Sequence, residues 1–239
     1  MINIKRLFFI SLFFSCFLCV SSIEAQRYNQ FDKNKKRTGV WKKYYPNKRI
    51  KYTGTFKNGK EVGTFKFYNM SFFRNPEAIK VFHKNSDSVT VTYFYDRGKL
   101  KGKGMLYGRK KVGKWIYYYK KGPVFSEESY VDGKLSGKSI VYFKSNGKIA
   151  EESTYKNGVL NGHSKNFSDK GILIEDVLYK NGKANGLAKY FELSGNLKEK
   201  GIYKNGIRVG KWEFYLDGEV VDQKQKKESR KNKIQQKNK

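Results

Sequence analysis

Short runs of alternating apolar and polar residues are interrupted by turn residues at regular distances along this chain. Runs of five to eight residues rich in Tyr, Phe, Trp, Ile, Val and Thr include 114–119, 138–143, 188–193 and 211–216. These compositions are typical of β-strands. No stretch after residue 25 keeps the i, i+3, i+4, i+7 apolar spacing of an amphipathic helix. The pattern therefore predicts an all-β protein.

Asn-Gly and Asp-Gly pairs between these runs predict the turns. Both dipeptides favour the type I′ turn, because its two central residues need a positive φ that Gly, Asn and Asp adopt at low cost. The clearest turn glycines each follow a tyrosine by three residues: Gly133 after Tyr130, Gly158 after Tyr155, Gly182 after Tyr179 and Gly206 after Tyr203. We predict antiparallel β-hairpins.

One unit of sequence recurs seven times between Gly39 and Gly218. Each copy has a glycine, a strand with a Tyr/Phe pair, a turn, then Tyr-x-Asn-Gly and another glycine. The clearest copies start at Gly113, Gly137, Gly162, Gly186 and Gly210, so the period is 24 or 25 residues. Periods of 20 to 50 residues indicate stacked supersecondary units, and a lone hairpin is only marginally stable in water. We expect residues 37–221 to form one elongated sheet of stacked hairpins.

Aromatic residues recur at two fixed distances from the repeat glycines. Trp41, Phe65, Trp115 and Trp212 follow Gly39, Gly63, Gly113 and Gly210 by two residues, and Tyr44, Tyr68, Tyr118, Tyr142, Phe167, Phe191 and Tyr215 follow their glycines by five. Because each set of aromatic residues recurs at a fixed position in the repeat, we predict that its members form ladders along the sheet. Each cross-strand aromatic pair in such a ladder contributes about 0.2–1 kcal/mol. A row that stacks on sugar rings or bases is the alternative. We favour packing between repeats, because it explains the spacing without a ligand.

These glycines and aromatic residues resemble the MORN-repeat superfamily across roughly residues 37–221. The similarity is greatest to the bacterial variant with G-x-W-x-x-Y-Y-x-x-G-K and Y-x-N-G-K-x-x-G half-motifs, a family that is often labelled a toxin–antitoxin system antitoxin. The resemblance implies a fold of stacked β-hairpins and a role in interaction or scaffolding. It implies no catalytic residues, because the motif positions are structural.

The repeat pattern breaks between Tyr68 and Val89. Alternation in 78–82 and 89–93 predicts one additional hairpin in this insertion, 69–88, with its turn near 85–88. The half-repeat at 102–113 is predicted to be shorter than the corresponding part of the other repeats. Insertions in repeat proteins map to one face, often the binding face, although an insertion without a role is the simpler interpretation.

The N-terminus has the pattern of a secretory signal peptide. Lys5 and Arg6 precede fourteen mostly apolar residues, and small residues lead to Ala25. Fourteen residues are short for a bilayer span, which needs about 20, so we expect cleavage after Ala25 rather than a retained anchor, with no transmembrane span thereafter. Residues 26–36 then form a short N-terminal segment before the repeats. Cys16 and Cys19 lie inside the apolar segment, so disulfides, thiolate metal sites and a thiol nucleophile are not expected in the exported chain.

The charge is strongly positive, with a formal net charge of +30. Residues 1–25 contribute +1, from Lys5, Arg6 and Glu24, which leaves +29 for the rest. Such a surface attracts polyanions such as anionic lipids. However, only nine of the 51 basic residues are Arg, the side chain suited to bidentate phosphate and base recognition, so no specific nucleic-acid readout is expected.

The last segment, 222–239, is basic and nearly without apolar residues, as in a disordered tail.

Candidate catalytic groups are few. His83 and His163 have no evident partner or metal-ligand spacing. Paired carboxylates occur in successive repeats, at 127–128, 151–152 and 175–176. They could hold a hard cation such as calcium, but we favour charge balance with lysines on neighbouring strands. No glycine-rich phosphate loop is present, because the glycines recur at the turns and at the starts of the repeats. The sequence thus predicts no enzyme, no cofactor and no metal site.

Three functions remain open at this stage. The favoured one is an exported scaffold, in the periplasm, at the outer-membrane periphery or outside the cell, that binds another protein. The first alternative is a lipid or polyanion binder that uses the lysine-rich surface and tail. The second is an antitoxin-like neutraliser of a protein toxin.

Overall fold

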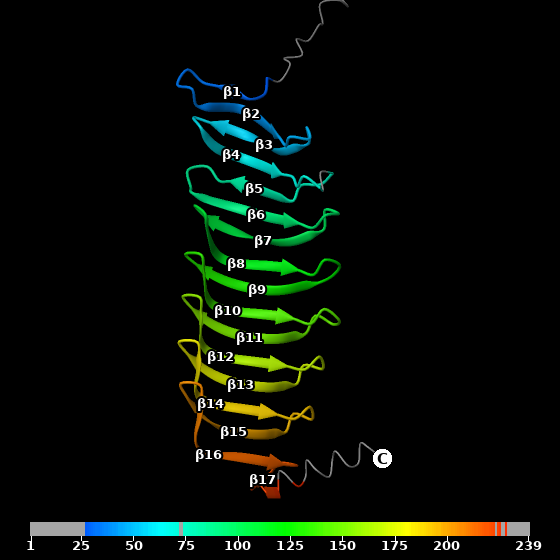
Figure 1. The fold of residues 1–239 in the computed structure, drawn as a ribbon, viewed down its shortest axis with the longest axis vertical. Helices are drawn as coiled ribbons and strands as arrows, with labels where there is room; N and C mark the ends of the chain where they lie inside the picture. Colours follow the sequence, from blue (N-terminus) through cyan, green and yellow to red (C-terminus); the bar gives the residue numbers. More distant parts are fainter. Residues whose placement is uncertain (1–26, 72–73, 223, 226–227, 229–239) are drawn as a thin grey trace, which may run out of the picture.

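The computed structural model describes residues 27–71, 74–222, 224, 225 and 228. The expected signal peptide, 1–25, and most of the expected tail, 222–239, lie outside the described residues. Seventeen strands form one sheet, and each strand pairs antiparallel with the next along the chain. The hairpins stack from β1 at one end of the sheet to β17 at the other (Figure 1). The predicted all-β fold of stacked antiparallel hairpins is confirmed.

The strands have similar lengths except at the two edges and in the insertion. They are β1 Gln30–Phe31, β2 Arg37–Tyr44, β3 Ile50–Lys57, β4 Lys60–Phe67, β5 Ala78–Phe82, β6 Ser88–Phe94, β7 Leu100–Tyr107, β8 Lys110–Tyr118, β9 Val124–Val131, β10 Lys134–Tyr142, β11 Ile149–Lys156, β12 Val159–Phe167, β13 Leu173–Lys180, β14 Lys183–Phe191, β15 Leu197–Lys204, β16 Ile207–Leu216 and β17 Glu219–Val221. The two edge strands, β1 and β17, are two and three residues long, and short edges limit pairing with other chains.

The tight turns have the predicted type I′ geometry. In the turn between β11 and β12, Asn157 has a φ of 53° and Gly158 a φ of 85°. The same pair of positive φ values recurs at Asp132 with Gly133 and at Asn181 with Gly182. A type I′ turn requires residues that tolerate this backbone conformation at both central positions.

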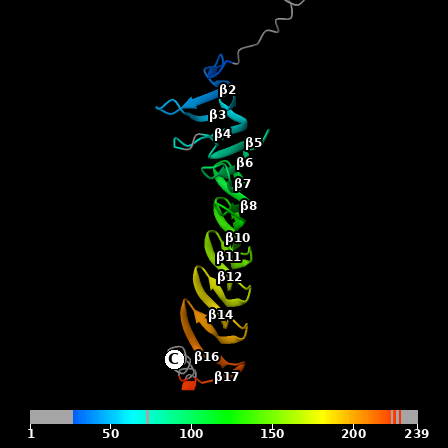
Figure 2. The same ribbon diagram turned by 90° about the vertical axis from the view of Figure 1, so that its right-hand side faces the viewer.

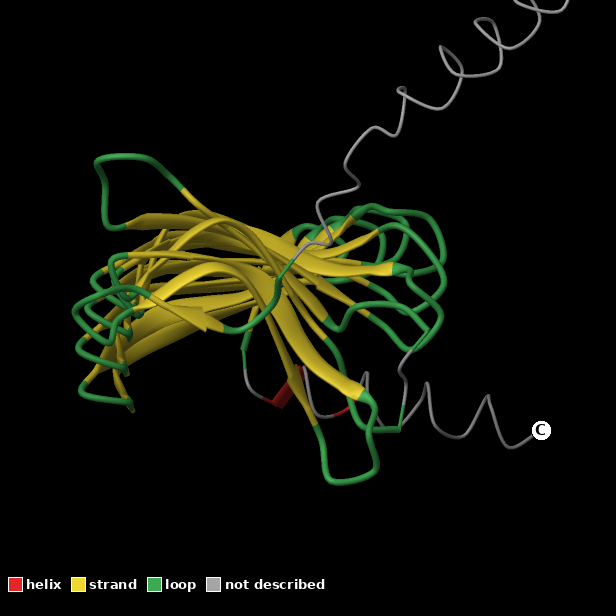
Figure 3. Ribbon diagram, turned by 90° about the horizontal axis from the view of Figure 1, so that it is seen from above, coloured by secondary structure: helices red, strands yellow, loops and turns green. Residues whose placement is uncertain are grey.

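The repeat glycines mark β-bulges. Between β9 and β10, Leu135 pairs with Tyr130 and Ser139 pairs with Glu128, so three residues of β10, 136–138, stand opposite one residue of β9, and Gly137 lies in this bulge. Gly137 has a φ of 101°. A bulge bends its strand and increases the local twist. Repeated in successive hairpins, it accounts for the strong curvature of the strands seen from the side and from above (Figures 2 and 3).

A large aromatic ring covers a strand glycine in three hairpins. A Cβ built on Gly104 would overlap the Trp115 ring, and the same holds for Gly201 under Trp212 and Gly54 under Phe65. Trp115 and Phe65 are completely buried. In a one-layer sheet such burial requires strands that bend around the side chain, so these rings lie on the inner side of the curve.

The insertion forms the predicted extra hairpin. Strands β5 and β6 pair antiparallel in the register Ile79 with Thr92 and Val81 with Thr90. The expectation of a shortened half-repeat at 102–113 was wrong. There β7 has eight residues and β8 has nine, as in neighbouring hairpins, and Gly108 and Arg109 close the hairpin with a positive φ at Gly108 only.

Tyrosine hydroxyls connect neighbouring repeats at the wider loops. Tyr45, Tyr95 and Tyr119 each donate a hydrogen bond to a carbonyl 23 residues further on, at 2.9, 2.9 and 2.8 Å. These bonds fix each loop against the next one. Among the described residues, no helix is long and apolar enough to span a membrane.

Candidate functional site

The sheet has two faces of different chemistry. We call the inner face, which bears Phe65, Trp115 and Trp212, the aromatic face. The opposite face bears Lys114, Lys138 and their carboxylate partners, and we call it the ion-pair face. Side chains alternate between the faces along each strand, so the two faces are the surfaces that the repeat offers to a partner.

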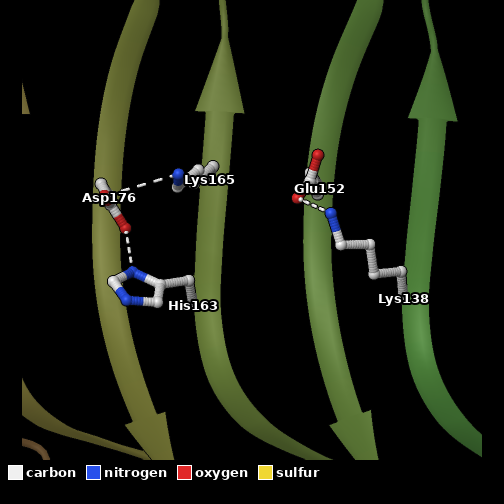
Figure 4. A network of polar contacts seen from close by, with 5 residues as sticks. All are labelled: Lys138, Glu152, His163, Lys165 and Asp176. Carbon is white, nitrogen blue, oxygen red and sulfur yellow. Dashed lines mark hydrogen bonds and ion pairs between the residues drawn. The ribbon is translucent and has the colours of Figure 1, made fainter.

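Cross-strand ion pairs run along the ion-pair face from β8 to β16. Lys114 lies 2.6 Å from Glu127, Lys138 lies 3.0 Å from Glu152, and Lys200 lies 3.0 Å from Glu213. Figure 4 shows Lys138 reaching across to Glu152 on the neighbouring strand. The preference for charge balance over a cation site therefore holds for Glu127 and Glu152.

His163 has a partner, contrary to the sequence-based expectation. Its Nδ1 lies 2.7 Å from Asp176 Oδ1 on the ion-pair face, and Lys165 Nζ lies 4.0 Å from the other oxygen of Asp176 (Figure 4). His83 Nε2 lies 2.8 Å from Thr90 Oγ1. Both partners are on adjacent strands, which the sequence spacing alone does not reveal.

The other members of the carboxylate pairs lie on the aromatic face. Tyr130 donates a hydrogen bond of 2.6 Å to Glu128, and Ser153 donates one of 2.6 Å to Glu151. Burial, followed by the Glu128 hydrogen bond, raises the pKa of the Tyr130 hydroxyl. Burial likewise raises the pKa of Tyr155 and of Tyr179. Neutral tyrosines thus line this face at neutral pH.

The two predicted aromatic ladders lie on opposite faces. Residues two positions after a repeat glycine are on the aromatic face, where Trp115 contacts Tyr93 and Tyr117 with ring centroids 6.2 and 6.1 Å apart. Residues five positions after the glycine are on the ion-pair face, as the hydrogen bond from Tyr215 to Glu213 shows. Tyr44 is 50% exposed, and Tyr118, Tyr142, Phe167, Phe191 and Tyr215 are half-buried.

Charge is distributed unevenly between the two halves of the sheet. Strands β2 to β7 contain one acidic residue, Glu61, against ten basic ones, whereas β8 to β16 contain eight acidic and fifteen basic residues. Lys42 and Lys66 both pair in register with Thr53, and Lys103 pairs with Thr92. The N-terminal half of the ion-pair face is therefore a cationic surface of lysine and threonine.

The residues named from the repeat pattern lie at turns, at bulges and in cross-strand contacts. The repeat glycines Gly39, Gly63, Gly113, Gly137, Gly162, Gly186 and Gly210 and the turn glycines Gly133, Gly158, Gly182 and Gly206 all have positive φ. Tyr203 contacts Trp212 across β15 and β16, with ring centroids 5.2 Å apart, and Trp41 Nε1 donates to the carbonyl oxygens of Gln30 and Thr38. Within the described ranges, no group of three or more His, Cys, Asp or Glu residues could hold a metal ion.

Sequence reasoning missed the pairing of strand glycines with large rings. Gly54, Gly104 and Gly201 each lie two residues before the position that tyrosine occupies in most repeats. The hairpins without this glycine have small residues where others have Trp: Ser164 lies opposite Ser153, and Ala188 opposite Val177. The sequence does contain a sign of this pairing. In some repeats a strand glycine occurs together with a large ring on the paired strand, and in the others a larger residue occurs together with a small one.

Comparisons with known proteins agree with the repeat assignment. Three segments, 37–58, 136–157 and 184–205, match the family described as "MORN repeat variant", which supports the MORN-repeat family. This description names no toxin or antitoxin, so it gives the antitoxin label no support. No curated protein matches the chain.

The solved structures with some similarity include the crystal structure of TarM, at 10% sequence identity and a TM-score of 0.22. The match covers 56% of this chain and 21% of that chain. A similarity this weak carries no argument about fold or function.

Proposed function

We propose that this protein is an exported, non-catalytic scaffold that binds another protein along the ion-pair face. The matched repeats support a role in binding. The signal-peptide pattern at residues 1–25 supports export, and the partner would then be a protein of the cell envelope.

The observation that carries the proposal is the aromatic column on the ion-pair face. Tyr142, Phe167 and Phe191 are half-buried although the described residues form no second layer over the sheet. Two lysines beside them have carboxylate partners: Lys138 Nζ lies 3.0 Å from Glu152 and Lys165 Nζ lies 4.0 Å from Asp176. A surface of aromatic side chains among paired charges resembles the centre of a protein interface, where aromatic residues are enriched and isolated charges are depleted.

A pull-down from envelope extract tests the proposal. We expect the chain to capture one protein at low and high salt, with and without residues 222–239, because contacts between aromatic side chains are insensitive to salt. Phe167→Ser together with Phe191→Ser should abolish the capture. Leu193→Ser, a change in a loop residue that is 70% exposed, is the matched control. Loss of every captured protein after deletion of residues 222–239, or at high salt, would contradict the proposed scaffold function.

A second candidate function is supported by the cationic surface of β2 to β7. Lys42, Lys66 and Lys103 have no ion-pair partner among the described residues, in contrast to Lys138. An anionic lipid or other polyanion would supply the missing negative charge. Charge-driven binding weakens linearly in a plot of log affinity against log salt concentration.

Vesicles with and without anionic lipid, together with inorganic polyphosphate, separate this candidate from the scaffold. If the surface binds either ligand, Lys42→Ala and Lys66→Ala should each weaken binding and reduce the salt slope by about one. Lys138→Ala is the control, because that lysine is already paired. An equal effect of all three substitutions would exclude the cationic surface as the site.

A further inference from the structure

The C-terminal edge of the sheet is only partly covered by its last strand. Of the ten residues of β16, only Phe214, Tyr215 and Leu216 pair with β17. On the side of β16 that faces away from β15, residues 207–213 have no pairing strand in the part of the chain that the structure describes. We call these residues the open edge, and they lie at the lower end of the stack in Figure 1. Although β17 is itself too short to pair widely, it leaves most of β16 available as a template for another strand.

Local hydrogen bonds stop the chain from covering this edge with a longer β17. Asp222 N donates to Gln225 Oε1 at 2.9 Å, and Gln225 N donates to Asp222 Oδ1 at 2.8 Å. This reciprocal arrangement has the form of a capping box, which begins a helical turn. The extended conformation of β17 therefore ends at Val221.

The opposite edge of the sheet is covered by residues that precede the repeats. Asn29 N donates to the Val40 carbonyl at 3.0 Å, and Lys42 N donates to Asn29 Oδ1 at 2.8 Å. Phe31 packs edge-to-face on Trp41, with ring centroids 5.1 Å apart. Of the two ends of the sheet, the C-terminal one is thus the end that leaves a strand open.

Strand β8 has the same motif as β16 and shows how the equivalent edge is covered inside the stack. The Lys111 carbonyl accepts a hydrogen bond of 2.9 Å from Gly133 N, in the turn after β9. The Trp115 ring contacts Tyr130 of β9 with ring centroids 6.4 Å apart. Trp115 is completely buried in this arrangement.

The corresponding residues of β16 lack such a neighbour. Arg208 and Trp212 occupy the positions of Lys111 and Trp115 in the repeat. Among the described residues, no hairpin follows β16 that could supply the glycine N–H and the tyrosine, and Trp212 is only half-buried. The open edge is therefore suited to an extended strand that carries a tyrosine.

Lys211 is the unbalanced charge of the open edge. It has no ion-pair partner within the described ranges, whereas the equivalent Lys114 lies 2.6 Å from Glu127. The neighbouring charge, Glu213, already lies 3.0 Å from Lys200. Opposite charges on directly facing residues stabilise an antiparallel pair. An acidic residue that faces Lys211 would therefore strengthen the pairing of an added strand.

The register of the internal pairing places this acidic residue next to the tyrosine. Between β8 and β9, the residues that face the repeat lysine and the glycine before it are Ser129 and Tyr130, which are adjacent in the chain. An added strand in the same register would face Lys211 with the residue directly before its tyrosine. The tyrosine ring itself would lie beside Trp212.

From these observations we infer that the open edge binds an extended segment of a partner protein by strand addition, with an Asp-Tyr or Glu-Tyr pair that faces Lys211 and contacts Trp212. In this mode of recognition, backbone hydrogen bonds give affinity and alternate side chains give specificity. The inference does not use the aromatic column on the ion-pair face, so it can fail or hold independently of the proposed scaffold function.

Charge argues against two other occupants of the open edge. Residues 223–239 of the chain itself contain no aromatic residue and have eight basic residues against one acidic residue, so they do not complement Lys211. A second copy of the chain would bring its own Arg208 and Lys211 to the same edge, and each copy has a formal net charge of +30.

Fluorescence anisotropy tests the inference with the full chain and a labelled peptide of ten residues, the length of β16, in which threonine and valine alternate around one central Glu-Tyr pair. We expect saturable binding. A peptide with Lys-Tyr should bind about fivefold more weakly, because a repulsive cross-strand pair replaces an attractive one. Lys211→Glu should reverse this order of preference. Lys180→Glu, at an exposed lysine of the internal strand β13, is the matched control and should leave the order unchanged.

Methylation of alternate backbone nitrogens of the peptide distinguishes strand addition from other modes of binding. Each of two such peptides keeps only one edge that can pair, so one should bind and the other should not. The inference would be overturned by no binding of the Glu-Tyr peptide, by equal binding of both methylated peptides, or by an unchanged preference in Lys211→Glu. A dimer detected by sedimentation in place of peptide binding would identify a second copy as the occupant and would also overturn it.

The variant Phe167→Ser with Phe191→Ser separates this inference from the proposed function. It should bind the Glu-Tyr peptide as the unsubstituted chain does, because the two phenylalanines lie on internal strands. Capture of an envelope protein without peptide binding would count against the open edge only, and peptide binding without capture would count against the ion-pair face only.

Discussion

Size matching between facing side chains determines which residues the inner side of the sheet accepts. Gly104 lies directly under the Trp115 ring, and a Cβ there would overlap the ring. We predict that Gly104→Ala destabilises the protein by about 1–3 kcal/mol, the usual cost of overpacking a filled core. Chemical denaturation measures this free energy of unfolding.

A double-mutant cycle isolates the cause. In a Trp115→Ala background the ring is absent, so the added methyl group should cost much less than it does in the unsubstituted chain. Additive effects of the two substitutions would show that Gly104 is needed for its backbone and not for the space it leaves.

Tyr130 leads to a prediction about alkaline pH. Burial and the bond to Glu128 raise the pKa of its hydroxyl above the ordinary 10.0. Because the folded pKa is the higher one, the stabilisation is fully present below about pH 10 and is lost as the pH rises through the folded pKa. We expect the Tm to fall above pH 10, and to fall less steeply in Tyr130→Phe, which has no proton to release. Thermal melts from pH 8 to 11.5 measure both slopes, and equal slopes would contradict the assignment.

At the scale of the element, the tyrosine bonds between loops add side-chain contacts between hairpins that are also joined by backbone pairing, ion pairs and ring contacts. Tyr45→Phe removes the bond to the Tyr68 carbonyl and should cost about 0.5–1.5 kcal/mol. Tyr44→Phe is the matched control, because the adjacent ring is 50% exposed. We expect it to change the free energy of unfolding by less than about 0.5 kcal/mol. Equal costs in chemical denaturation would argue against a role for these bonds between repeats.

The elements were predictable from sequence because each depends on local chemistry. Asn157 and Gly158 specify their turn through φ alone, and the alternation in 78–82 identified the inserted hairpin. Contacts between strands were harder to predict. The partner of His163 depends on the register between β12 and β13, which shifts between Asn166 and Phe167.

At the scale of the whole molecule, connections between consecutive hairpins determine the shape. All the strand pairings for which a register is defined join neighbours in sequence, from β1 with β2 to β16 with β17. Contacts are therefore local, and stability is close to a sum of nearest-neighbour terms. Such a molecule lengthens with each repeat and does not enclose a central core.

Solution scattering measures this shape. Seventeen strands leave sixteen intervals of about 4.8 Å, so the sheet is roughly 77 Å long. A uniform rod of that length has a radius of gyration of roughly 22 Å before its width is added. The compact-domain scaling gives about 16 Å for residues 27–221. We therefore expect a measured value above about 22 Å and a long tail in the pair-distance distribution. A value near the compact one would show that the stack folds back on itself in solution, and the ion-pair face could not then be open along its full length to a partner.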